Sequence, residues 1–282
     1  SFLKYWLNKQ DLNKYISGTT RGKLNQKVMN RIKIPLPFLN GKPDLETQQK
    51  IVSILGKAES LKQKREEADK LTNEYLKSVF YEMFLKKGFE EVELGDKRIC
   101  EISGEYGSGA GALEYNWRIR YIRITDIDEK GNLRDEKVSP SRIEEKYLLK
   151  KGDLLFARSG ATVGKTYLHN SNDLNYQYAG YLIRFKFKDN ITPEYVYYFT
   201  KTPKYLGWIA SIQKVVAQPN INAQQYSSLQ IPLPPIELQQ KFSSIVEHVE
   251  KMKEKQKESG EQIKNLFNAL VQKAFKGELI KW

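Results

Sequence analysis

A glycine-rich loop at residues 159–166, SGATVGKT, is the strongest candidate for phosphate chemistry. It approaches the pattern G-x-x-x-x-G-K-[ST], whose backbone amides and lysine hold phosphates. The pattern requires glycine where Ser159 stands, and its lysine should open a helix whose N-terminal amides bind the phosphate. The residues that follow predict a strand instead, so we interpret the segment as a strand-to-strand loop. This loop presents Arg158, Thr162 and Lys165.

Other groupings that could support catalysis are weaker. Asp44 and Glu46 could hold Mg²⁺ as paired carboxylates, but a related stretch later in the chain lacks the aspartate, so a helix cap explains Asp44 better. His169 and His248 are the only histidines, and no cysteine cluster or nucleophile accompanies them. No D-P-P-Y or N-P-P-Y element of an amino-methyltransferase occurs. We therefore expect no catalytic centre, no metal site and no cofactor on this chain.

Polar and aromatic side chains in segments that resemble loops remain as candidates for binding. Gln and Asn pair with adenine, Arg and Lys pair with guanine, and further cations contact phosphates. The candidate DNA-binding residues are Tyr106, Ser108, Arg158, Ser159, Thr162, Lys165, Tyr176, Gln177, Gln213, Lys214, Gln218 and Asn220. Trp117 lies in a segment of the same kind. Together with the net charge of +13, this set favours double-stranded DNA as a partner.

These loops must be positioned by a framework that the chain carries twice. The sequence IPLP occurs at residues 34–37 and again at 231–234, an offset of 197. The helical sequence behind it begins QQK at residues 48 and 239, an offset of 191, because the first copy inserts six residues at 38–43. Both copies continue in register without a gap.

Each copy predicts a long amphipathic helix, at about residues 44–87 and 235–276, with Asp44 as the first N-cap. A heptad seam in both helices predicts an antiparallel coiled coil. The predicted seam is Ile51, Ile54, Ala58, Leu61, Arg65, Ala68, Thr72, Tyr75 and Val79, matched by Phe242, Ile245, Val249, Met252, Gln256, Ser259, Ile263, Leu266 and Leu270.

The segment between the helices predicts a mixed α+β fold. Strand-like runs occur at residues 118–124, 152–158 and 181–187, and the last alternates, with Tyr181 on the same face as three apolar residues. Thr192, Thr202 and Asn222 predict the starts of three short helices.

Composition limits the class of protein. Of the 282 residues, 40% are hydrophobic, which supports a packed core. Residues 1–88 carry a net charge of +9, while residues 89–220 and 221–282 carry +2 each. A single cysteine, Cys100, excludes an intrachain disulfide framework, and no apolar run could span a membrane. We expect a soluble, cytoplasmic protein without membrane contact.

The internal repeat and an ordered set of motifs resemble the specificity subunits of type I restriction-modification systems. The motifs are residues 92–96 (VELGD), 121–127 (YIRITDI), 149–155 (LKKGDLL), 159–165 (SGATVGK), 218–222 (QPNIN), 231–234 (IPLP) and 275–279 (FKGEL). The resemblance implies two target-recognition domains separated by a pair of long helices conserved in the family. It also implies that modification subunits, which bind S-adenosylmethionine, dock on the helices, and that restriction (motor-nuclease) subunits join them.

The resemblance also assigns parts of the chain. Residues 1–43 would be the C-terminal remnant of a first target-recognition domain, whose earlier portion we expect to be missing. Residues 44–88 and 235–282 would be the long helices, and residues 89–234 the second recognition domain, which reads half of a bipartite DNA target.

Two other functions are open at this point. One is a nucleotide-binding protein that uses the 160–166 loop, which ATP titration would reveal. The other is a coiled-coil scaffold whose globule binds protein, which salt-dependent DNA affinity would exclude.

Overall fold

A computed structural model describes residues 1–16, 24–173, 175–213 and 220–281. They form two compact units, residues 1–72 with 251–282 and residues 73–250. Both long helices contribute to each unit. None of the helices in the described ranges combines the length and apolarity that a membrane span requires.

The described part of the first unit is helical apart from one small hairpin. Its elements are α1 (Phe2–Lys9), a 3-10 turn (Leu12–Tyr15), α2 (Gln26–Met29), β1 (Phe38–Leu39), β2 (Lys42–Pro43), most of α3 (Leu45–Phe80) and the C-terminal part of α7 (Ile236–Phe275). The six inserted residues thus form a β-hairpin, whose turn residues Asn40 and Gly41 both have positive φ. An Asn-Gly pair suits this turn because both residues tolerate the left-handed region.

The predicted start of the first long helix is confirmed. Asp44 accepts a hydrogen bond at Oδ1 from the backbone N–H of Thr47, 3.0 Å away. That bond satisfies a helix N–H that has no partner within the helix. A hydrogen bond from the Thr47 side chain, together with this backbone bond, holds the pKa of Asp44 below its ordinary value. A single π-helical turn, Tyr81–Leu85, continues α3 beyond Phe80.

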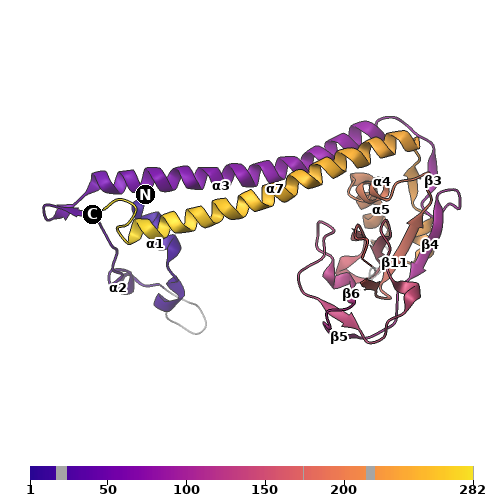
Figure 1. Ribbon diagram of the computed structural model, residues 1–282, viewed down its shortest axis with the longest axis horizontal. Coiled ribbons are helices and arrows are strands. Elements are labelled where there is room, and N and C mark those ends of the chain that lie inside the picture. Colours follow the sequence, from indigo (N-terminus) through magenta and orange to yellow (C-terminus); the bar gives the residue numbers. More distant parts are fainter. Residues whose placement is uncertain (17–23, 174, 214–219, 282) are drawn as a thin grey trace. The chain divides into compact units, whose positions relative to one another are not determined.

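The long helices pair antiparallel, as predicted (Figure 1). In the first unit, the start of α3 shares a hydrophobic cluster with the end of α7, and the cluster includes Ile51 and Val271. In the second unit, the end of α3 packs against the start of α7 in a cluster that includes Phe80 and Phe242.

The predicted seam is only partly right. Ile51, Ala58, Thr72, Phe242 and Val249 are buried as predicted. Four other seam residues are between 44% and 51% exposed, namely Leu61, Tyr75, Met252 and Leu266. Leu55, Leu76, Phe80, Val246 and Val271 are buried instead. An α-helix has 3.6 residues per turn and drifts about 20° per heptad from a strict seven-residue repeat. Residues chosen by that repeat from Ile51 onward therefore rotate away from the partner helix along its length.

The second unit has the predicted α+β fold. Its strands are β3 (Glu91–Glu93), β4 (Cys100–Tyr106), β5 (Ala112–Glu114), β6 (Arg120–Ile122), β7 (Val138–Pro140), β8 (Leu154–Ala157), β9 (Thr166–Leu168), β10 (Tyr176–Tyr178), β11 (Leu182–Phe187) and β12 (Gln230–Pro232). Its short helices are α4 (Pro193–Phe199), α5 (Pro203–Gln213) and α6 (Ala223–Ser227). The central sheet has the order β4-β11-β8-β9, with every neighbouring pair antiparallel. The two-stranded pairs β10-β6, β12-β3 and β5-β7 surround it.

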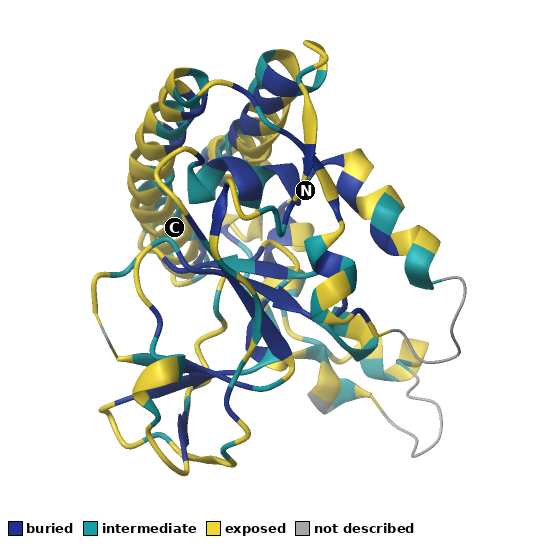
Figure 2. Cartoon of the chain, turned by 90° about the vertical axis from the view of Figure 1, so that its right-hand side faces the viewer, coloured by how far each residue is buried: buried dark blue, intermediate teal, exposed yellow. Residues whose placement is uncertain are grey.

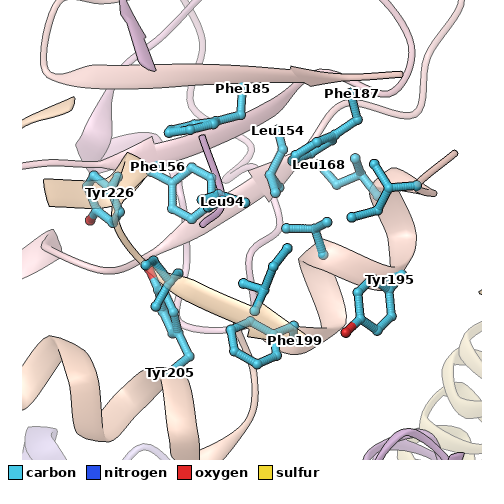
Figure 3. Packing of buried hydrophobic residues seen from close by; sticks show 14 of the residues in the cluster. Leu94, Leu154, Phe156, Leu168, Phe185, Phe187, Tyr195, Phe199, Tyr205 and Tyr226 are labelled. Carbon is cyan, nitrogen blue, oxygen red and sulfur yellow. The ribbon is translucent and has the colours of Figure 1, made fainter. Parts of the chain in front are cut away.

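The core of this unit lies between the central sheet and the short helices (Figure 3). Phe156 and Phe185 meet edge to face on neighbouring strands, with ring centroids 5.2 Å apart, and Tyr226 packs on Phe156 at 4.8 Å. In Figure 2 the buried residues follow these strands, while many loops at the rim of the unit are exposed.

The alternation predicted for β11 needs one correction. Ile183, Phe185 and Phe187 do face the core, but the opposite face is buried as well, and Arg184 is only 7% exposed. Tyr181 precedes the strand and is 61% exposed, so it does not belong to the core face.

Candidate nucleic-acid interface

The loop between β8 and β9 is a closed hairpin with no phosphate-binding geometry. Ala157 donates its N–H to the carbonyl of Lys165 (2.9 Å), and Gly164 donates to the carbonyl of Ala157 (3.1 Å). Two core tyrosines hold it from beneath, since Tyr226 donates its hydroxyl to the Ala157 carbonyl (2.7 Å) and Tyr205 to the Gly164 carbonyl (2.9 Å). Strand β9 follows the loop where a nucleotide-binding loop would open a helix. The strand-to-strand interpretation is therefore confirmed.

Three of the predicted site residues meet at the end of this hairpin, although 52 to 114 residues separate them in sequence. The guanidinium carbon of Arg158 lies 4.7 Å from the ring centroid of Tyr106. Its Nε donates to Oδ1 of Asn220 (3.3 Å). The Arg158 carbonyl accepts from the N–H of Ile221 (2.8 Å), so the backbone preceding α6 pairs with the end of β8. We call Tyr106, Arg158 and Asn220 the Arg158 cluster.

The members of this cluster are held by the fold. The Tyr106 hydroxyl accepts a hydrogen bond from the N–H of Ala223 in the first turn of α6 (3.0 Å). The N–H of Arg158 donates to the carbonyl of Tyr181 (3.1 Å), which brings the exposed Tyr181 side chain to the same edge of the sheet. Sequence reasoning missed Tyr181 because alternation placed it on the core face. Gly180 immediately before it was the signal that the chain turns there.

A buried ion network supports the end of β4 beside the cluster. Arg184 forms ion pairs with Glu105 and with Asp153, the latter at 3.3 Å. Burial works to raise the pKa of Glu105, but the charge of Arg184 and hydrogen bonds from Lys146, Arg184 and Tyr178 hold that pKa below its ordinary value. Glu105 is adjacent to Tyr106, so this network fixes the backbone on which Tyr106 stands.

Lys165 is more constrained than the sequence suggested. Its Nζ lies 2.7 Å from Oε1 of Glu129 and donates to the carbonyl of Ile127 (3.4 Å), and its side chain is 14% exposed. A contact between Lys165 and phosphate would compete with this ion pair. The hydroxyl of Thr162 is also used within the loop, donating to the carbonyl of Ser159 (2.8 Å).

Two predicted residues are buried, and we remove them from the candidate surface. Ser108 is 1% exposed and donates its hydroxyl to Glu144. Gln177 is fully buried, where its Oε1 accepts from the N–H of Glu144 (2.9 Å) and its Nε2 donates to the carbonyl of Arg142 (3.2 Å). Both side chains tie β10 and the Ser108 backbone to the segment around Glu144. A polar residue within a strand cannot be told apart from a loop residue by its type alone.

The remaining candidates lie elsewhere in the unit. Tyr176 is half-buried on β10, with its ring 4.8 Å from that of His169. Gln213 is the last residue of α5. Lys214 and Gln218 lie outside the described residues.

The described ranges contain no group of three or more His, Cys, Asp or Glu side chains arranged to hold a metal ion. Cys100 is buried and donates its thiol to the carbonyl of Leu94 (2.9 Å). Burial raises the pKa of this thiol to about 12, so it stays protonated at neutral pH.

Comparison with known proteins decides the family. The model of the family described as "Type I restriction modification DNA specificity domain" matches residues 1–71 and 86–265. The chain belongs to this family. Its members are DNA-specificity components, which confirms the predicted role as a DNA-recognition subunit and leaves the nucleotide-binding and scaffold alternatives without support.

Individual relatives agree with this assignment. The chain is 24% identical to the specificity subunit of the type I restriction enzyme MjaVIII of Methanocaldococcus jannaschii, over 96% of this chain and 68% of that protein. A solved S subunit of a type I restriction-modification system from M. genitalium matches 97% of this chain and 72% of its own, with a TM-score of 0.60 and 17% identity. A chain from a structure that describes complex assembly and conformational transition of a type I restriction-modification system covers 99% of this chain and 68% of its own, with a TM-score of 0.60 and 21% identity. The two structures show a shared fold.

Proposed function

We propose that residues 89–234 of this specificity subunit form a recognition domain that reads one half of a bipartite DNA target. The Arg158 cluster carries the proposal. It brings a cation, an amide and an aromatic ring together at the end of a rigid hairpin. Arginine recognises guanine through two parallel hydrogen bonds, and asparagine recognises adenine in the same way. The amide of Asn220 orients the guanidinium, so the two side chains would act on DNA together.

We further propose roles for the rest of the chain. Residues 44–88 and 235–282 form the helix pair on which modification subunits dock and which restriction subunits then join. The relative whose structure describes complex assembly supports this part. Residues 1–43 correspond to the tail of a first recognition domain. S-adenosylmethionine would bind the modification subunits, and action on DNA implies a cytoplasmic location.

Binding measurements with two single substitutions test the DNA surface. Arg158→Ala should cost about 1–3 kcal/mol on the preferred sequence and much less on scrambled duplexes, because a base contact is lost. Lys165→Ala should weaken binding to all sequences alike and lower the slope of log affinity against log salt by roughly one unit, if Lys165 leaves Glu129 for a phosphate.

A matched control removes one positive charge elsewhere in the same unit. Lys204 pairs with Glu91 near the start of α5, away from the Arg158 cluster, so Lys204→Ala should leave both affinity and salt slope unchanged. If Arg158→Ala and Lys165→Ala both keep the wild-type affinity and salt slope, another part of the unit binds DNA.

A further inference from the structure

Trp117 is the most exposed large hydrophobic side chain among the described residues, with 85% of its surface accessible. It stands between β5 and β6, and its indole lies 5.3 Å from the ring of Tyr115. Covering such a side chain with a partner surface is favourable, because its apolar area leaves water.

The backbone at Trp117 is held in an unusual conformation. Its φ is +63°, in the left-handed region that glycine and asparagine adopt more readily than tryptophan. Asn116 fixes the bend, since its N–H donates to the Ser139 hydroxyl (3.0 Å) and its Oδ1 accepts from the N–H of Arg118 (3.0 Å). The chain therefore presents the indole from a rigid turn, and tryptophan occupies a site where another residue would cost less.

Positive charge accompanies the ring. Arg118 and Lys137 are exposed, and Lys137 lies with its Nζ 5.6 Å from the ring centroid of Tyr115. No ion pair in the described part of the chain involves either cation. An exposed aromatic ring accompanied by exposed cations is a combination that binds nucleic acid, where the ring stacks on a base and the cations contact phosphates.

The fold connects this turn to the Arg158 cluster. Strand β4 ends at Tyr106, and the segment that leads from it to β5 is locked by backbone bonds, with Ser108 donating to Tyr178 (2.9 Å) and Gly180 donating to Ser108 (2.8 Å). The Tyr121 hydroxyl also donates to the carbonyl of Ala110 (2.9 Å). Strand β5 lies at the edge of the unit away from α4 and α5 (Figure 1).

We propose that Trp117 stacks its indole on a base of the bound DNA and so contributes a second contact, separate from the Arg158 cluster. The proposal rests on the proposed DNA-recognition function. Phosphate contacts from Arg118 and Lys137 would hold the turn against the DNA backbone while the ring is inserted.

Affinity of the full chain for a random-sequence duplex pool tests the proposal, using Trp117→Phe, Trp117→Leu and Trp117→Gly. Phenylalanine retains a stacking face, so its affinity should stay within roughly threefold of wild type. Leucine retains apolar area without a π face and glycine retains neither, so both should bind roughly tenfold or more weakly. Trp117→Gly should melt at or above the wild-type temperature, because glycine fits the positive φ. A lower affinity with undiminished stability separates stacking from a structural role.

Fluorescence provides a second readout. The wild-type spectrum minus that of Trp117→Phe isolates the Trp117 emission, which duplex addition should quench.

Equal affinity of wild type, Trp117→Leu and Trp117→Gly, or an unquenched Trp117 emission, would overturn the stacking proposal. Normal DNA affinity combined with lost co-purification of a modification subunit would also overturn it and assign the ring to a protein partner. Failure of wild type itself to bind any duplex would instead refute the proposed function, and the stacking proposal with it.

Discussion

The two units are built on the same helix contacts, and among the described residues the second unit adds a β-rich layer. In the first unit the ring of Phe2 on α1 meets Phe275 at 4.9 Å and 64°. In the second unit the ring of Tyr195 on α4 meets Phe84 at 4.8 Å and 67°. Phe84 and Phe275 are related by the 191-residue repeat. The short helices α1 and α4 therefore dock on the long helices in the same way.

A second matched contact lies beside the first. Tyr5 donates its hydroxyl to Glu59 (2.8 Å), and Tyr198 donates to Glu250 (3.4 Å). The two glutamates are again 191 residues apart. Burial, together with the bond to Glu59, raises the pKa of Tyr5 to about 12.

The difference lies in what covers the short helices. Leu3 on α1 is 43% exposed, whereas Val196 at the equivalent position of α4 is fully buried. Met29 after the first cap is 52% exposed, whereas Tyr226 after the second is fully buried in the core. In the described residues, short helices thus pack on the long helices in both units, and the sheet of the second unit adds a further layer of burial.

The largest effect should come from the two matched phenylalanines. Phe84 is 1% exposed among Phe80, Tyr195 and Phe242, so Phe84→Ala should cost about 3–5 kcal/mol of unfolding free energy. Phe275 is partly buried, so Phe275→Ala should cost about 1–2 kcal/mol. Urea unfolding followed by far-ultraviolet circular dichroism measures both. Equal losses would show that the sheet adds nothing to the second end.

For the matched tyrosines, the loss of unfolding free energy should be larger in the first unit than in the second. Both losses should be smaller than that of Phe84→Ala. Tyr5→Phe removes the shorter bond to a carboxylate and should cost about 1–2 kcal/mol, while Tyr198→Phe should cost less than about 1 kcal/mol. The same unfolding measurement applies, and a larger loss in Tyr198→Phe would contradict the geometric comparison.

Much of this framework could be predicted from the sequence because it depends on local and periodic signals. The repeat, the cap at Asp44 and the proline-marked starts of α4 and α5 each follow from residue type and spacing. The seam at Leu61 and Tyr75 failed because the contact face depends on how the helices twist around each other.

The candidate site was less accessible to prediction. The meeting of Tyr106, Arg158 and Asn220 depends on strand order, which no local signal specifies. Ser108 and Gln177 were predicted to lie in loops, whereas both side chains are buried, because the burial of a polar side chain is decided by its partners. Trp117 was noticed as a loop residue, but its positive φ is visible only in the fold.

Acidification should destabilise the second unit by about 1 kcal/mol. His169 in the second unit is fully buried, and burial lowers its pKa. Below the ordinary histidine pKa of about 6.5 the unfolded chain binds a proton that folded His169 resists, so stability falls as the pH falls, by at most about 1.4 kcal/mol per pH unit. Urea unfolding at pH 7.5 and 5.5 should show this loss in wild type and a smaller one in His169→Gln. An equal pH dependence in both proteins would assign the effect to other groups.

Selection of bound duplexes from a random-sequence pool by the full chain, read by sequencing, tests the central claim most directly. Recognition by residues 89–234 predicts enrichment of a single short, uninterrupted motif, with weaker selection at some positions of that motif in Arg158→Ala. Two separated motifs at a fixed spacing, or no enrichment at all, would contradict the account.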